Sequence, residues 1–394
     1  MKKLVISLLV LGCAFSVFAD NYPVPPSTDK ITYIDEQFRT QDGLVLHGHL
    51  AIPAGQKGPF PVVLMLVGSG SSDRYENIVG GTVDGKPALL FKGIEDGLIA
   101  KDIAVFMYDK RGVIPLDNTF YYSTRTADFQ TANANNLAND AVSAFDFTKQ
   151  IPLVDPRRIA IFGHSEGTFL AIKTMEKRTD QVRSLFLLGM ITSTPKEIFH
   201  AQFTTDNVRI FNLVNAGQTG TLTQEEYDNF AAQAGPVFTE IYGTWQSFYN
   251  ANSQLARPGQ ITEQEFNYTN KQIWKQLVEA AYDDSKPWKM TEPRAWLREY
   301  LAEGSYLPRE MPFCSKIHVF QGEVDQDTPF EDALTLRNSC NAAHTPLASF
   351  NNYPNLEHAL SPYIGYKNWQ DTMGPMDPQG TADIVNAITK DLLQ

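Results

Sequence analysis

The chain has 394 residues, of which 43% are hydrophobic and 20% are charged, and its formal net charge at pH 7 is −12. This acidic balance disfavours nucleic acid and anionic membrane surfaces as partners. After the N-terminal segment, no stretch approaches the roughly 18 apolar residues that a membrane-spanning helix requires.

The N-terminus has the layout of a secretory signal peptide. Lys2 and Lys3 precede an apolar run, Leu4–Phe18, that leads into a candidate cleavage site. We therefore expect residues 1–19 to be removed from an exported chain, periplasmic or secreted, whose net charge falls from −12 to −14 because two lysines are lost. A second interpretation, a lipoprotein anchored at Cys13, stays open.

The rest of the chain alternates between strand-like and helix-like patterns. Near-continuous apolar runs are typical of strands covered on both faces, and a turn at Asp42-Gly43 joins the first two strands into an antiparallel hairpin. The predicted strands are Ile31–Thr40, Leu44–Ile52, Phe60–Val67, Ile103–Asp109, Arg158–Phe162, Val182–Leu188, Lys316–Gln321 and Ala348–Tyr353. The predicted helices are Pro87–Ala100, Asn135–Thr148, Thr168–Lys177, Phe330–Ser339 and Thr381–Leu393. This order predicts an α/β fold with a mostly parallel central sheet flanked by helices.

One long segment interrupts the alternation. More than a hundred residues separate Leu188 from Lys316, and a structureless loop of that length is improbable in a compact domain. The segment contains four of the five tryptophans in a helical rhythm. We predict that residues 191–311 form an inserted helical cap, and that residues 20–190 and 312–394 form the core. A minority of the cap's aromatic side chains should line an apolar pocket.

The most informative motif is Gly163-His164-Ser165-Glu166-Gly167, between a predicted strand and a predicted helix. Gly-x-Ser-x-Gly in this context can force the serine into a strained turn that exposes its hydroxyl at the carboxyl edge of a parallel sheet. The glycines are needed because no Cβ fits where the turn folds back on its neighbours. A serine in an ordinary glycine turn is the alternative, and the flanking strand and helix argue against it.

Together these parts resemble the α/β-hydrolase superfamily, and within it the secreted, esterase-like serine hydrolases. The matching pieces are Val67-Gly-Ser-Gly-Ser-Ser-Asp-Arg74, Tyr108-Asp-Lys-Arg-Gly112, the Ser165 motif, Gly322-Glu-Val-Asp-Gln-Asp-Thr-Pro329 and His358. The resemblance implies an α/β-hydrolase fold with an inserted cap. It also implies the order nucleophile, acid, histidine, which Ser165, Asp325 and His358 satisfy.

The chemistry of the partners supports the same residues. A serine hydroxyl needs a base, and histidine suits that task with an unperturbed pKa of about 6.5. Of the seven histidines, His358 alone follows a late strand in a loop that could reach the sheet edge, and we expect the His164 side chain to point away from that edge. The other histidines are on the early hairpin, in a strand, in the cap or behind a helix: His47, His49, His200, His318 and His344.

The acid that orients the histidine is expected just past the end of a strand, after Gly322. Asp325 has that position and matches the Gly-x-x-Asp pattern of the family. Glu323 and Asp327 are close enough in sequence to compete for the role.

The oxyanion of the reaction needs preorganised N–H donors. We expect one from the backbone of Glu166, the residue after the nucleophile, and the other from Ser69, with Gly68 allowing close approach. The alternative for Gly68-Ser-Gly70, a phosphate-binding loop, is rejected because the Gly-Lys-Ser/Thr ending and the dinucleotide spacing are both missing.

Cysteines and charges give two structural predictions. Cys314 precedes a strand and Cys340 ends the following helix, which places both at the sheet edge opposite the active site and makes them a disulfide candidate. Two free buried thiols are the alternative. We also expect buried ion pairs that brace the loops beside the nucleophile, formed by Asp73, Arg74, Asp109 and Arg111. Direct substrate contact by Arg74 or Arg111 is the alternative.

The resulting hypothesis is an exported serine hydrolase that cleaves a small-molecule carboxylic ester through an acyl-enzyme. No cofactor or metal is expected, and the chain should be a monomer or a weak dimer. Peptidase, thioesterase and acyltransferase activities use the same groups and stay open. A non-catalytic ligand-binding relative is the rival from another class.

Overall fold

A computed structural model describes residues 22–83, 86–202, 204, 211, 212, 214, 215, 219–234, 243–252, 259–288, 290, 292–305, 307, 311–325, 327–362 and 375–394. The expected signal peptide and Cys13 lie outside these residues. No helix in the described part of the chain is both long and apolar enough to span a membrane.

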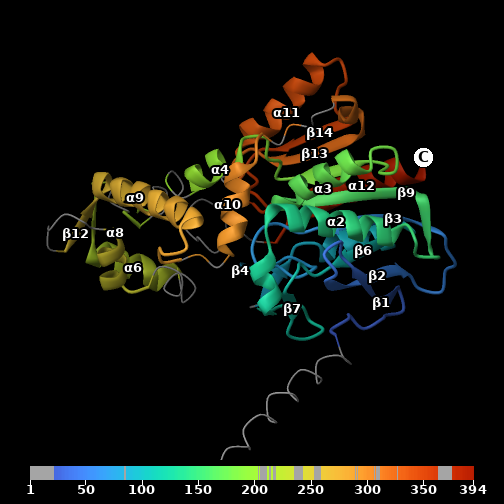
Figure 1. The fold of residues 1–394 in the computed structure, drawn as a ribbon, viewed down its shortest axis with the longest axis horizontal. Helices are drawn as coiled ribbons and strands as arrows, with labels where there is room; N and C mark the ends of the chain where they lie inside the picture. Colours follow the sequence, from blue (N-terminus) through green and yellow to red (C-terminus); the bar gives the residue numbers. More distant parts are fainter. Residues whose placement is uncertain are drawn as a thin grey trace, which may run out of the picture.

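The centre of the fold is an eight-stranded sheet in the order β1-β2-β6-β3-β9-β10-β13-β14 (Figure 1). The first two strands pair antiparallel, as does β2 with β6, and the remaining neighbours are parallel. The strands are β1 (Ile31–Arg39), β2 (Val45–Pro53), β3 (Phe60–Leu66), β6 (Ala104–Tyr108), β9 (Val154–His164), β10 (Leu185–Leu188), β13 (Ile317–Gly322) and β14 (Ser349–Tyr353). The predicted mostly parallel sheet is therefore confirmed.

Both faces of the sheet are covered by helices, which fits the apolar run of its central strand β3. All seven residues of β3 are buried, and they alternate between two clusters: Leu64 packs on one side, and Val63 and Met65 pack on the other. The first cluster includes residues of α2 (Ala134–Thr148), α3 (Glu166–Lys177) and α11 (Phe330–Ala342). The second includes residues of α1 (Lys92–Ile99) and α12 (Pro378–Leu393). Helices thus form a layer on each face (Figure 1).

One helix prediction was wrong. Pro87–Ala100 was expected to be helical, but its first part is strand β5 (Lys86–Leu89), which pairs antiparallel with β4 (Asn77–Val83), and only α1 is helix. The short apolar run at this point fits a strand as well as a helix, and pairing with β4 decided the outcome. Two small elements were also not predicted, the β7 (Val113–Pro115) and β8 (Ser123–Arg125) ladder and a 3-10 turn at Ala127–Thr131.

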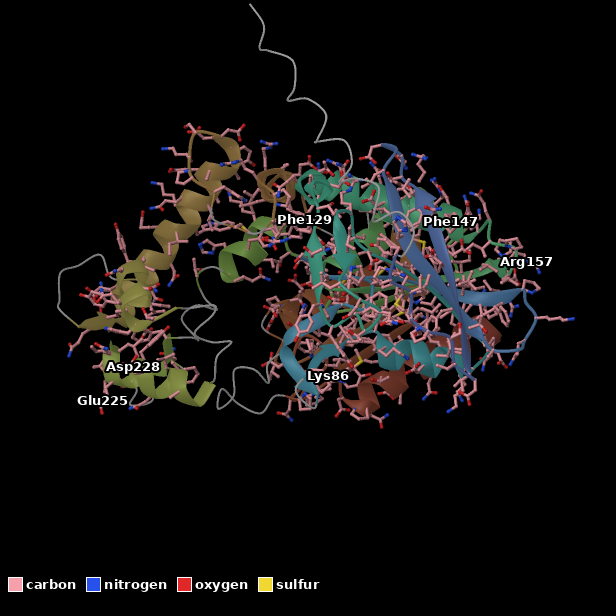
Figure 2. The ribbon with its side chains drawn as sticks, turned by 90° about the horizontal axis from the view of Figure 1, so that it is seen from below. Lys86, Phe129, Phe147, Arg157, Glu225 and Asp228 are labelled. Carbon is pink, nitrogen blue, oxygen red and sulfur yellow. A yellow bond between two sulfur atoms is a disulfide. The ribbon has the colours of Figure 1, made fainter. Side chains whose placement is uncertain are left out.

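The segment between β10 and β13 is mostly helical in its described part, with one short two-stranded ladder. It contains α4 (Pro195–Ala201), β11 (Thr221–Thr223), α6 (Gln224–Ala234), α8 (Trp245–Asn252), β12 (Gln260–Thr262), α9 (Glu263–Tyr282) and α10 (Arg294–Ala302). We call β11, α6, α8, β12 and the first half of α9 the outer lobe, because they lie to one side of the sheet, with α4 and α10 between (Figure 1). Figure 2 shows Glu225 and Asp228 of α6 at the opposite end of the molecule from Arg157 in β9.

The outer lobe has a hydrophobic cluster of its own. Phe211 and Val214, which precede β11 in the chain, also belong to this cluster. Its buried members are Phe211, Val214, Leu222, Tyr227, Trp245, Phe248, Ile261 and Phe266. The end of α9 and α10 instead pack on the sheet cluster through Leu277, Ala281, Trp296, Leu297 and Tyr300. The aromatic side chains of the insertion are therefore divided between two cores.

A disulfide joins Cys314 to Cys340, with Cα atoms 5.8 Å apart. Cys314 lies in a 3-10 helix, Met311–Lys316, immediately before β13, and Cys340 lies near the end of α11. Both are fully buried. The bond forms at the amino end of β13, as the sequence predicted.

Candidate active site

Ser165 occupies the sharp turn between β9 and α3. Its backbone has a positive φ, with φ 53° and ψ −120°, a conformation that residues with a Cβ rarely adopt. The turn leaves no room for side chains at its flanking glycines: a Cβ at Gly163 would lie 2.3 Å from the Gly167 oxygen, and one at Gly167 would lie 2.1 Å from the Leu66 oxygen. The Ser165 N–H donates to the Leu188 carbonyl at 2.9 Å, which fixes the turn to the neighbouring strand.

Asp325 and His358 meet at the same edge of the sheet. Asp325 follows β13 and His358 follows β14, and Asp325 Oδ2 is 2.9 Å from His358 Nδ1. The same carboxylate accepts hydrogen bonds from the Thr328 N–H at 2.8 Å, the Thr328 hydroxyl at 2.7 Å and the Gln321 side chain at 2.7 Å. Asp325 is therefore held on several sides, with one oxygen facing the imidazole.

The two competing acids have other partners. Glu323 accepts a hydrogen bond from the Asn352 side chain, and the Asp327 N–H donates to Asp325 Oδ1 at 3.0 Å. Of the three carboxylates, Asp325 is the one that bonds to His358.

Burial and charge shift the two pKa values in opposite directions. Burial alone would lower the pKa of His358, but the Asp325 carboxylate outweighs it and raises this pKa to about 9. Burial alone would raise the pKa of Asp325, but His358 and the Thr328 hydrogen bonds lower it below the ordinary value. Each group thus stabilises the charged form of the other.

Among the described residues, no hydrogen bond joins Ser165 to His358, although both lie beside the Leu188–Gly189 segment. Gly189 has a φ of +66°, and its N–H donates to the Phe320 carbonyl of β13 at 3.3 Å. A Cβ at Gly189 would lie 2.8 Å from His358 Cε1, and Ser165 bonds to the residue just before Gly189. Serine–histidine bonds are often long in ligand-free enzymes and tighten when substrate binds.

Ser69, Ser165 and Glu166 line one small cavity at this edge. Its volume is about 40 Å³, and its other walls are mainly apolar: Phe169, Ile191, Pro195, Ile198, Phe199, Gln202, Trp296 and Tyr300. Among the described residues, the backbone N–H groups of Ser69 and Glu166 have no hydrogen-bond partner. A larger hollow of about 830 Å³ lies between the N-terminal segment and α1, and it contains none of the predicted site residues.

Two charged side chains that the sequence did not single out, Glu76 and Lys110, bond to residues at this cavity, as does the insertion residue Trp296. Glu76 accepts the Gly68 N–H at 2.9 Å, and Lys110 donates both to the Gly68 carbonyl and, at 2.7 Å, to the Glu166 carboxylate. Trp296 donates to the other Glu166 oxygen at 2.8 Å. The Asp-Lys-Arg-Gly piece was a signal for Lys110, whereas nothing in the sequence pointed to Glu76.

The sequence analysis expected the His164 side chain to point away from the site, and this prediction was wrong. Its Nδ1 lies 2.8 Å from Glu76 Oε1 and its Nε2 lies 3.3 Å from the His358 carbonyl oxygen, with the two imidazole rings 4.6 Å apart. Burial of the ring between the Glu76 loop and the His358 loop explains the difference. His164 is therefore a contact between these two loops.

The predicted ion pairs are present for two arginines but not for Asp73. Arg74 bonds to Asp109 at 2.5 Å, and Arg111 bonds to Asp140 at 2.6 Å and to Asp42 at 2.9 Å. Asp73 instead accepts the Tyr75 N–H, and its Oδ2 has no partner among the described residues. Burial and the nearby Asp109 charge raise the pKa of Asp73 to about 8.

The described residues contain no group of three or more histidine, cysteine or acidic side chains that could hold a metal ion.

Comparison with known proteins gives partial matches. No protein-family model matches the chain. A stretch of 149 residues is 34% identical to esterase EstD of Thermotoga maritima, covering 37% of this chain and 31% of that protein. Another stretch of 218 residues is 26% identical to polyketide transferase ATR5 of Stachybotrys chlorohalonatus, covering 54% of this chain and 58% of that protein. The matches span less than two thirds of either relative.

Among solved structures, a bacterial heroin esterase is similar at 15% identity and a TM-score of 0.48, covering 93% of this chain and 86% of that one. The strand order and the turn at Ser165 are those of the α/β-hydrolase fold. The chain thus has this fold and is esterase-like in sequence over about a third of its length.

Proposed function

We propose that the chain is a serine esterase in which Ser165, His358 and Asp325 act together. One observation carries the proposal: a serine on left-handed backbone lies at the sheet edge where a buried aspartate–histidine pair and two unpartnered N–H groups also lie. The sequence match to an esterase supports the same reaction class.

The reaction follows from the chemistry of these groups. His358 accepts the Ser165 proton while the serine oxygen attacks the ester carbonyl, and Asp325 stabilises the imidazolium that forms. The N–H groups of Ser69 and Glu166 hydrogen-bond the oxyanion of the tetrahedral intermediate. The imidazolium then returns its proton to the departing alcohol, and a water molecule, activated by His358, hydrolyses the acyl-enzyme.

The cavity beside Ser165 supports a short acyl group. A volume of about 40 Å³ holds about three water-sized groups, which matches acetyl or propionyl rather than a long chain. Its walls are largely apolar, so a charged acyl group would lose hydration without finding a partner.

The test is hydrolysis of p-nitrophenyl esters, from acetate to palmitate, by the wild-type chain and by Ser165→Ala. We expect activity that peaks at short chains, and loss of at least about 10³-fold in the variant with unchanged folding. The control is Ser143→Ala in α2, which removes only a hydrogen bond to the Asn139 carbonyl. Retention of ester hydrolysis by Ser165→Ala would sink the proposal, as would failure of a fluorophosphonate to label Ser165.

A second candidate is acyl transfer, which the match to a polyketide transferase favours. The acyl-enzyme would form in the same way, but an alcohol or an amine, instead of water, would accept the acyl group. Product analysis in the presence of added alcohols separates the two, because a transferase yields more of the new ester than of the free acid.

We also propose that the chain is exported, with residues 1–19 as its signal. The Cys314–Cys340 disulfide supports an oxidising compartment. Mass spectrometry of the expressed protein tests this proposal. A chain that begins at Asp20 agrees with secretion, one acylated at Cys13 indicates a lipoprotein, and an unprocessed chain contradicts both.

A further inference from the structure

Lys110 lies just past the end of β6, is only 5% exposed, and takes no part in the reaction proposed above. Its ammonium group donates to the Gly68 carbonyl and to the Glu166 carboxylate. We infer that Lys110 is a positioning residue that sets both oxyanion donors, by holding the Gly68–Ser69 peptide and the Glu166 side chain at once. The inference rests on the proposed esterase function.

The first contact fixes the direction of the Ser69 N–H. Among the described residues, the one cis peptide bond is Gly58–Pro59, so the Gly68–Ser69 peptide is trans. In a trans peptide, the carbonyl and the following N–H point in opposite directions. Because Lys110 holds the Gly68 oxygen on one side, the Ser69 N–H must face the other side. Ser69 lines the cavity with Ser165, which is where that donor is needed.

The preceding peptide is fixed as well, so the loop has little freedom to rotate. Gly68 donates its N–H to Glu76 Oε1 at 2.9 Å. A Cβ at Gly68 would lie 2.4 Å from this oxygen and 3.1 Å from Ser165 Cβ, which shows how closely the loop approaches the nucleophile. Glu76 and Lys110 thus hold the two polar groups of Gly68 at once.

The second contact reaches the other donor. The Glu166 carboxylate lies between Lys110 Nζ at 2.7 Å and Trp296 Nε1 at 2.8 Å, and is itself buried. The N–H of the same residue is the second proposed oxyanion donor. Trp296, on α10, also forms part of the cavity wall. Lys110 and Glu166 therefore link both donors to the surface that an acyl group would contact.

The positive charge of Lys110 should also stabilise the oxyanion that forms during the reaction. Glu166 lines the cavity, Glu76 accepts the Gly68 N–H, and both side chains are buried. In a buried site such negative charges would oppose an oxyanion. The ammonium group of Lys110 offsets the Glu166 charge and polarises the peptide that carries the Ser69 donor. Its removal would leave Glu166 as a buried carboxylate without its cation.

The experiment compares Lys110→Met, which keeps the length of the side chain without its charge, with the wild-type chain on a short p-nitrophenyl ester. We expect kcat to fall roughly 10- to 100-fold with KM changed less than about threefold, because the lost interactions act on the transition state. Affinity for an alkylboronic acid, which forms a tetrahedral adduct on Ser165, should fall by the same factor as kcat/KM. A purely structural role would not link these two quantities.

The double variant Lys110→Met/Glu166→Gln supplies the second measurement. Removal of the unpaired carboxylate should restore part of the lost kcat, and a double variant slower than Lys110→Met would contradict the charge argument. The matched control is Lys316→Met, since Lys316 also donates to two backbone carbonyls, those of Thr179 and Val182, but before β13 at the other sheet edge. It should keep wild-type kcat.

Each remaining outcome has a definite meaning. A folded Lys110→Met enzyme with wild-type kcat and boronate affinity overturns the inference. If neither Lys110 variant folds, Lys110 is a structural residue and the inference is again wrong. A wild-type chain that shows no Ser165-dependent hydrolysis and no boronate binding is a different failure, because it rejects the proposed function itself.

Discussion

The sheet core packs apolar residues on two faces, whereas the outer lobe closes around one small aromatic cluster. In the core, neighbouring residues of β3 point into different clusters, so each strand is held from both sides. Among the described residues, the cluster of the lobe has eight buried members, five of them aromatic, and two of the eight lie just before the lobe in sequence. Every residue of the proposed reaction lies on the core, whereas Trp296 of the inserted α10 bonds to Glu166 and lines the cavity. The sheet core therefore holds the proposed reacting groups, and the insertion supplies part of the wall around them.

Asp325→Asn should give the largest loss of activity, although the change touches only the carboxyl edge of the sheet core. We expect kcat to fall by about 10⁴-fold, because an amide at this position favours the wrong tautomer of His358. The wild-type kcat/KM should rise with pH through the pKa of His358, which Asp325 raises to about 9, since the base must be unprotonated. Without the carboxylate this limb should move to lower pH. A pH–rate profile checks both points, and an unmoved limb would contradict them.

Phe162→Ala and Phe248→Ala test the difference between core and lobe directly. Phe162 in β9 is fully buried against Phe91, so its truncation should cost about 3–5 kcal/mol of unfolding free energy. Phe248 is buried in the lobe beside Tyr227 and Phe266, so its loss should expose the lobe to limited proteolysis. Denaturant unfolding followed by circular dichroism should show the main transition shifted in the first variant only. Equal shifts in both would mean that core and lobe unfold together.

Removal of the disulfide should give an intermediate loss of stability, confined to the sheet core. The paired change Cys314→Ser/Cys340→Ser opens a covalent loop with a sequence separation of 26, for which chain entropy predicts a loss of about 3.5 kcal/mol. Because the bond lies at the amino end of β13, kcat at a temperature where the variant stays folded should be unchanged. Thermal unfolding and ester hydrolysis on the same samples measure the two quantities. A fall in kcat without a fall in Tm is the result that this placement does not allow.

Asp73→Asn should give the smallest effect, and with the opposite sign. Burial and the Asp109 charge raise the pKa of Asp73 to about 8, so the folded chain keeps a proton that the unfolded chain releases above about pH 4. Folding stability then falls as pH rises between these values. The amide can still accept the Tyr75 N–H, so we expect Tm to rise by about 2–4 °C at pH 8 and to change little at pH 4. An equal Tm difference at both pH values would count against this assignment.

The core could be predicted from the sequence because its strands are continuous apolar runs. Phe60–Val67 has no other reading than a strand covered on both faces, and the structure ends it one residue earlier. The helix predicted from Pro87 was wrong at its start, because a short apolar run fits a strand as well as a helix until its partner strand is known. The lobe could be predicted only as helical, since its pairing of β11 with β12 depends on residues far apart in the chain.

The site divides in the same way. Ser165, Asp325 and His358 each follow a strand end, which is visible in the sequence. Glu76 and Lys110 act on Gly68 from other loops, and their contacts depend on the folded approach of those loops.

The backbone of Ser165 also has a consequence for stability. A non-glycine residue at φ 53° carries a cost of roughly 1–3 kcal/mol that glycine would avoid. Ser165→Gly is therefore expected to raise the free energy of unfolding while it removes the hydroxyl on which the proposed reaction depends.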